Sequence, residues 1–296
     1  MTTDHVPAES APVDLPQGKV AYRVAGPAAS DHPPVVLVHG LLVDNRLWTP
    51  VAERLAADGI RSYAPTLPLG AHRLPMNADA DLSPTGVAGL VLDFIRALDL
   101  SDVILVGNDT GGAISQIMLG ADSSRIGAVV LTDCDALGTF PPLGLAPLFR
   151  ALRYPWLVAR LASALKAKAL RHGPLAYGLL TSEPLDPELT LDWMRPAADP
   201  AIRRDLAKFA RGVDPKVLLD AADRFGQFSG PVRILWGEAD PYFKVKLGRR
   251  LSEAFPRATF ATVSGGRAFL PLDHPDRVVG EILAAARDAR QPDPAG

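Results

Sequence analysis

The segment that most constrains the fold is Val103-Ile-Leu-Val-Gly-Asn-Asp-Thr-Gly-Gly112, an apolar run that passes through a glycine-flanked turn into a helical pattern. Gly107 and Gly111 stand two residues before and after Asp109, and such small residues permit a turn too tight for larger side chains. The pattern predicts a buried strand that ends with an exposed Asp109 side chain. The free backbone N–H groups that open the following helix favour negative charge there.

The other apolar runs are also short, continuous and bounded by turn residues, which is typical of buried parallel strands. With the first part of the segment above they cover residues 35–38, 103–106, 128–131 and 232–236. Stretches with helical spacing follow or separate them, at residues 50–59, 84–98, 112–119 and 243–255. This order predicts an α/β fold with a mostly parallel central sheet flanked by helices.

The alternation stops after Asp135, and residues 137–228 contain helical patterns without a convincing strand. We therefore predict a helical cap at 137–228, inserted into an α/β core made of 14–136 and 229–290. Residues 1–13 and 291–296 show no periodicity and are predicted to be loose tails. Four aromatic residues are candidates to line a substrate pocket, namely Trp48, Tyr154, Tyr177 and Trp193.

The turn at Asp109 has the form of a nucleophile elbow, and the chain resembles the α/β-hydrolase superfamily, in particular its Asp-nucleophile branch. That branch contains haloalkane dehalogenases, fluoroacetate dehalogenases and epoxide hydrolases. The resemblance implies that the Asp109 carboxylate attacks carbon and that the backbone N–H groups of Leu41 and Thr110 form the oxyanion hole. It also implies that Asp240 is the acid that orients a catalytic histidine. Asp133 and Asp135, after the preceding strand, are weaker candidates for that acid.

The position of the general-base histidine in this family corresponds to Ala268, within the stretch Gly265–Pro271. Without that base, an ester on Asp109 is expected to persist. Either a histidine has been replaced deliberately to stall the reaction, or the protein naturally lacks the base. The otherwise intact site pattern favours the first explanation. His274 is a weaker candidate for the base because it lies at the apparent start of the last helix.

The substrate is predicted to be a mostly apolar small molecule, and its reactive group stays open between an epoxide, a carbon–halogen bond and an ester. Thr110 stands where haloalkane dehalogenases usually place tryptophan, and Leu42 stands where epoxide hydrolases usually place proline. Tyr154 and Tyr177 are candidates for acids that protonate an opening ring. The alternatives to a hydrolase are a non-catalytic binder or receptor on the same fold, and a lyase or isomerase in which Asp109 transfers protons.

Composition and charge exclude several classes of binding partner. The net charge of −2 gives no basic patch for nucleic acid, and no apolar run reaches the roughly 18 residues of a membrane helix. Cys134 is the only cysteine, which excludes an internal disulfide, and no histidine pair has metal-ligand spacing. We therefore expect a cytoplasmic monomer or homodimer that uses no cofactor and no metal.

Overall fold

The computed structural model describes residues 8–174 and 176–290. A single eight-stranded sheet organises them, with strand order β1-β4-β6-β5-β7-β8-β9-β10. Strands β1 and β4 are antiparallel to their neighbours, and the strands from β6 to β10 are parallel to one another. The sheet strands are β1 (Ala8–Glu9), β4 (Tyr22–Ala25), β5 (Val35–Val38), β6 (Ser62–Pro65), β7 (Val103–Asp109), β8 (Ile126–Cys134), β9 (Val232–Gly237) and β10 (Ala258–Val263).

The predicted mostly parallel sheet is confirmed, and its four predicted strands are the four at its centre or next to it, β5, β7, β8 and β9. Every residue of β5 is buried, and β7 is buried up to its last residue. Such strands face helices on both sides and consist almost entirely of apolar residues, which is why the sequence shows them clearly.

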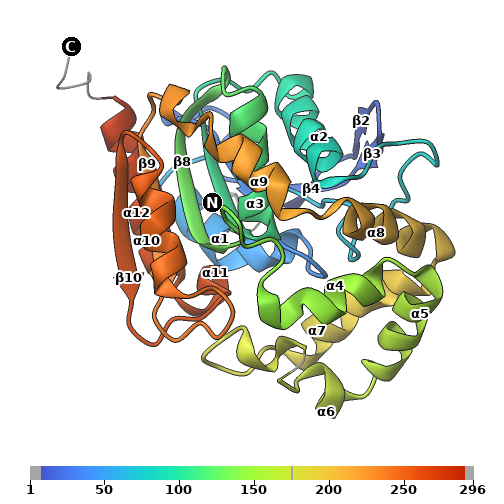
Figure 1. Ribbon diagram of the computed structural model, residues 1–296. Helices are drawn as coiled ribbons and strands as arrows, with labels where there is room; N and C mark the ends of the chain where they lie inside the picture. Colours follow the sequence, from blue (N-terminus) through green and yellow to red (C-terminus); the bar gives the residue numbers. More distant parts are fainter. Residues whose placement is uncertain (1–7, 175, 291–296) are drawn as a thin grey trace.

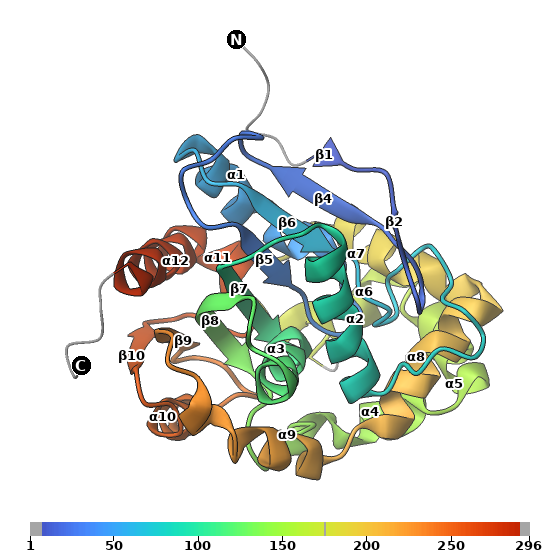
Figure 2. The same cartoon turned by 90° about the horizontal axis from the view of Figure 1, so that it is seen from above.

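Helices cover both faces of the sheet (Figure 2). On one face, α12 packs against β8, β9 and α1, and on the other, α3 packs against β7, β8 and α2 while α10 packs against β9 and β10. These helices are α1 (Thr49–Ala57), α2 (Pro84–Ala97), α3 (Thr110–Ala121), α10 (Val245–Glu253) and α12 (Pro275–Ala289), and the short α11 (Leu270–Asp273) precedes α12.

Between β8 and β9 the described residues form helices, turns and one isolated β-bridge, Ala136 with Thr139, and they contain no strand. Helices α4 to α8 lie together beyond one end of the sheet (Figure 1), and we call residues 137–213 the insertion. Its helices are α4 (Ala146–Leu152), α5 (Pro155–Ala164), α6 (Lys168–Arg171), α7 (Pro187–Met194) and α8 (Pro200–Gly212). The next helix, α9 (Pro215–Ala222), packs against α3 beside the sheet. The predicted range 137–228 therefore extends one helix too far.

The N-terminal prediction of a loose tail over 1–13 needs a correction. Ala8–Glu9 pairs with β4 as strand β1, and Val13 begins β2 (Val13–Leu15), which forms a hairpin with β3 (Gly18–Val20). The backbone groups of these short strands gain hydrogen-bond partners that the composition does not reveal. Residues 1–7 and the predicted tail 291–296 lie outside the described residues.

Candidate active site

Asp109 is the last residue of β7, and α3 begins at the next residue. Its backbone has φ 55° and ψ −133°, a conformation that costs a residue with a side chain about 1–3 kcal/mol. The turn closes because Gly111 has no side chain: a Cβ there would collide with the carbonyl oxygens of Val38 and His39. The glycine spacing in the sequence thus reflects a sharp turn that presents Asp109 at the end of the central strand.

The carboxylate of Asp109 is held by a backbone donor. The N–H of Leu41 donates to its Oδ2 at 3.0 Å. Gly40 allows this approach, because a Cβ on it would overlap the Asp109 side chain. The structure thus places one predicted oxyanion-hole donor, the Leu41 N–H, on the carboxylate itself, while the other belongs to Thr110, the residue that follows Asp109.

Burial raises the pKa of Asp109 to about 7, and the negative charge of Asp240 adds to the rise. The N–H groups of Leu41 and Thr110 oppose it by stabilising the ionised form. Near neutral pH the carboxyl is thus divided between its charged and neutral forms. The charged form is only weakly solvated, which suits a nucleophile.

Asp240 lies in the loop after β9, close to Asp133 from the end of β8. Oδ1 of Asp240 accepts the N–H groups of Tyr242 at 2.6 Å and Phe243 at 3.0 Å, while Asp133 accepts the N–H of Gly237 at 2.9 Å. Burial raises the pKa of both carboxyls, most strongly that of Asp133, where the negative charge of Asp240 adds to the rise. Protonation is therefore favoured at Asp133 over Asp240.

Oδ2 of Asp240 is buried without a hydrogen-bond partner among the described protein atoms. A buried carboxylate oxygen without a donor is costly, and an imidazole N–H is a donor that would satisfy it. Helix α10 begins at Val245, after its cap Lys244, so Asp240 is not a helix cap.

Ala268 is buried in the loop between β10 and α11. Its carbonyl oxygen accepts a hydrogen bond from Nδ2 of Asn108, the residue before Asp109, at 2.7 Å. The N–H of the next residue, Phe269, donates to the carbonyl of Leu180 in the insertion at 2.8 Å. The loop expected to carry the base therefore lies against the elbow on one side and the insertion on the other.

No histidine in the described part of the chain replaces the missing base. The ring of His39 is held by the Gly40 carbonyl and the Leu67 N–H, and His72 pairs with Asp205. His274 stands at the start of α12, and neither it nor any other described histidine is among the cavity-lining residues given below.

A cavity opens above Asp109, between the sheet and the insertion. Most of its wall is aliphatic or aromatic, and the polar side chains in it are those of Asp109, Thr110, Asp135, Tyr177 and Tyr242. The apolar residues that line it are Leu41, Leu42, Pro142, Leu145, Leu148, Phe149, Leu165, Ala176, Leu180, Met194, Phe243 and Phe269. Such a wall selects a small, uncharged, mostly apolar molecule.

Of the four aromatic residues predicted for the pocket, only Tyr177 lines this cavity. Trp48 is fully buried in the core, and Trp193 is fully buried with its indole N–H bonded to Asp44. The Tyr154 side chain is 54% exposed on the outside of the insertion. Those three predictions were wrong because aromatic composition alone does not distinguish a pocket wall from a packing contact.

Asp135 has a place that sequence reasoning missed. The resemblance makes it only a weaker candidate for the orienting acid, yet it lines the cavity together with Asp109 and is 1% exposed. Its Oδ2 accepts the hydroxyl of Thr110 at 3.3 Å, and its Oδ1 has no partner among the described protein atoms. Burial raises its pKa well above the usual range, and the charge of Asp109 adds to this effect. The spacing Asp133-Cys-Asp135 after a buried strand was the available signal.

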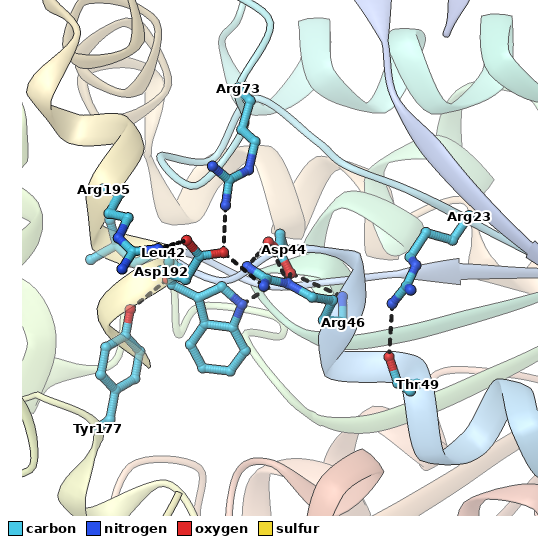
Figure 3. A network of polar contacts seen from close by, with 10 residues as sticks. Arg23, Leu42, Asp44, Arg46, Thr49, Arg73, Tyr177, Asp192 and Arg195 are labelled. Carbon is cyan, nitrogen blue, oxygen red and sulfur yellow. Dashed lines mark hydrogen bonds and ion pairs between the residues drawn. The ribbon is translucent and has the colours of Figure 1, made fainter. Parts of the chain in front are cut away.

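A network of polar contacts fixes the insertion over the oxyanion loop (Figure 3). Arg46 pairs with Asp44 at 2.6 Å on the core side and with Asp192 of α7 at 2.7 Å on the insertion side. The Tyr177 hydroxyl donates to the carbonyl of Leu42 at 2.5 Å. The insertion is therefore anchored directly to the loop that supplies the Leu41 N–H.

Within residues 8–174 and 176–290, no group of His, Cys, Asp or Glu side chains is arranged to hold a metal ion. No helix in these ranges has the length and apolar character needed to cross a membrane.

Comparison with known proteins agrees with this architecture. Haloalkane dehalogenase 2 of Mycobacterium tuberculosis is 25% identical over 297 residues, which cover 94% of each protein. An alpha/beta hydrolase fold protein from Burkholderia ambifaria superposes with a TM-score of 0.75 at 22% identity, covering 95% of this chain and 99% of that one. Haloalkane dehalogenase DbeA from Bradyrhizobium elkani gives 0.74 at 17% identity, covering 94% and 98%. A family model described as alpha/beta hydrolase fold matches residues 33–275, and the chain therefore belongs to that family.

Proposed function

We propose that the protein is a cofactor-free hydrolase in which the Asp109 carboxylate attacks an electrophilic carbon and forms an ester with the substrate. One observation carries the proposal: Asp109 is presented by a strained turn at the floor of an apolar cavity, with Oδ2 bonded to the N–H of Leu41. The insertion acts as the cap that encloses the substrate. The haloalkane dehalogenases among the relatives support a substrate in which a leaving group can be displaced from carbon.

The arrangement suits both steps of such a reaction. In the first, an oxygen of Asp109 forms a bond to carbon while a halide leaves or an epoxide ring opens. In the second, water attacks the ester carbonyl, and negative charge develops on the carboxylate oxygen beside the Leu41 N–H. That N–H already donates to Oδ2 of Asp109, so it can stabilise the charge without reorganisation.

Ala268 limits the second step. Its methyl group cannot take a proton from water. Unless the first step itself produces a base in the cavity, we expect the ester to persist on Asp109. For haloalkanes we therefore propose that this sequence is a base-deleted form, which traps the alkyl group.

The test incubates the protein with 1-bromohexane or styrene oxide. Intact-protein mass spectrometry then detects an adduct, and peptide mapping locates it. The expected result is one hexyl group on Asp109 after incubation with 1-bromohexane. Asp109→Asn should acquire none, and Asp58→Asn, which changes an exposed aspartate on the far end of α1, should acquire it like the parent. If neither probe gives an adduct or product with the parent protein, the proposal is wrong.

Restoring the base provides a second test. In Ala268→His, an imidazole would meet the unpartnered Oδ2 of Asp240 and could take a proton from water. We expect hydrolysis of the hexyl ester to accelerate by about 10²–10⁴-fold, the usual contribution of a positioned base. Release of hexanol measures it. A folded variant, shown by an unchanged circular dichroism spectrum, that retains the adduct as long as the parent would contradict the proposed role of position 268.

A non-catalytic binder is the second candidate, and the buried Ala268 in the base position favours it. It predicts reversible binding of apolar ligands, no adduct on Asp109 and no gain from Ala268→His. A single turnover in ¹⁸O-labelled water distinguishes this hydrolase from a lyase or isomerase that uses Asp109 for proton transfer. Only hydrolysis of an ester on Asp109 would place ¹⁸O in its carboxyl group.

A further inference from the structure

The hydroxyl groups in the cavity wall are poorly placed to give a proton to a substrate. The Tyr177 hydroxyl donates to the Leu42 carbonyl, the Tyr242 hydroxyl to the Pro174 carbonyl at 3.0 Å, and the Thr110 hydroxyl to Asp135. Each hydroxyl has one hydrogen, and each is already committed. The tyrosine predicted as a ring-opening acid is thus engaged elsewhere, which leaves Asp135 as the remaining acid in the described cavity wall.

Asp135 lines the cavity and has one carboxyl oxygen without a hydrogen-bond partner. The Thr110 hydroxyl donates to its Oδ2, while the buried Oδ1 has no partner among the described protein atoms. Its main-chain carbonyl accepts a hydrogen bond from Nε2 of Gln116 at 2.8 Å, which fixes the position of the residue. Burial and the charge of the nearby Asp109 raise its pKa, which favours the neutral form that carries a hydrogen. The other buried pair, Asp133 and Asp240, is absent from the cavity lining.

We propose that Asp135 is a catalytic acid and base, and that it directs the enzyme toward epoxides, whose leaving oxygen needs a proton, rather than haloalkanes. The inference rests on the proposed function, because it requires the ester on Asp109.

The steps balance. Asp109 forms a bond to a ring carbon, the carbon–oxygen bond breaks, and the ring oxygen takes the proton of Asp135. Asp135 is now a carboxylate and accepts a proton from the water that attacks the ester. The departing alcohol oxygen takes the second proton of that water. A diol leaves, and both carboxyls return to their starting states.

A haloalkane follows a different course. Halide leaves without a proton, so Asp135 stays neutral and cannot accept one from water. The ester then persists in the absence of a base at position 268. The same residue thus explains how a chain without the histidine turns over one substrate class and is alkylated by the other.

The experiment compares the parent with Asp135→Asn, using styrene oxide and 1-bromohexane. Asparagine matches the neutral acid in shape but has no carboxyl proton to give, so opening of styrene oxide should slow by about 10²-fold more than alkylation by 1-bromohexane does. An unchanged circular dichroism spectrum shows that the variant is folded. The parent should release phenylethanediol continuously and retain the hexyl group. Asp58→Asn is the control for an aspartate change outside the site.

The outcomes separate the two proposals. If the parent reacts with neither probe, the ester chemistry itself is refuted. If the parent is alkylated but Asp135→Asn opens styrene oxide at the parent rate, or slows both probes equally, only the role of Asp135 is refuted. Equal turnover of both probes by the parent would refute the preference for epoxides.

Discussion

At the scale of single residues, the pKa of about 7 at Asp109 determines when it can attack. Only the ionised carboxylate is a nucleophile, so its rate of alkylation should follow the ionised fraction. We expect the rate with 1-bromohexane to be constant above about pH 8 and to fall by roughly 100-fold at pH 5, where about one carboxyl in a hundred would be ionised. Timed mass spectrometry across this range measures it. An unshifted aspartate would show no decline until below about pH 5.

The sequence groups Asp109, Leu41 and Thr110, and the structure places Leu41 and Thr110 next to Asp109, because glycines at fixed distances leave few conformations open to the turn. The role that we propose for Asp135 could not be predicted, since whether an acid faces a cavity depends on where the insertion closes. It also could not assign the tyrosines, because a hydroxyl bonded to a distant carbonyl, as in Tyr177 and Leu42, leaves no local pattern.

At the scale of elements, the central strands and their helices were predictable, whereas the outer strands were not. Strand β6 reads Ser-Tyr-Ala-Pro, and β10 is only partly buried at the edge of the sheet, so neither shows a continuous apolar run. The helix α9 was assigned to the insertion because its contact with α3 is invisible in the sequence.

The anchoring of α7 to the core provides a prediction at this scale. The Trp193 indole N–H donates to Oδ1 of Asp44 at 3.0 Å, and both residues are buried. Trp193→Phe removes a donor to a charged group and should lower the free energy of unfolding by about 1–3 kcal/mol. Urea titration measures it. Trp156→Phe, at a tryptophan that is 61% exposed, should change stability by less than about 0.5 kcal/mol, and equal losses in both would show that the hydrogen bond is unimportant.

At the scale of the whole molecule, the buried carboxyls make stability depend on pH in an unusual direction. Burial raises the pKa of Asp109, Asp133, Asp135 and Asp240, so the folded protein binds more protons than the unfolded chain above the ordinary aspartate pKa of 3.8. Stability conferred by such groups is lost as the pH rises through their folded pKa values. His39 opposes this at lower pH, because burial lowers its pKa from 6.5 to about 4.

Above pH 7 His39 is neutral in both states and no longer opposes the carboxyls, and the Cys134 thiol, whose pKa burial also raises, acts in the same direction as they do. We expect the free energy of unfolding of the parent to fall between pH 7 and pH 9, by at most about 1.4 kcal/mol per pH unit for each carboxyl that still holds its proton. Asp135→Asn removes one such group and should make the decline shallower by up to about 2 kcal/mol over that interval, whereas Asp58→Asn should leave it unchanged. Urea titrations at several pH values measure the slope. Parallel curves for the parent and Asp135→Asn would mean that Asp135 holds no proton there, and the acid that the epoxide reaction requires would then be missing.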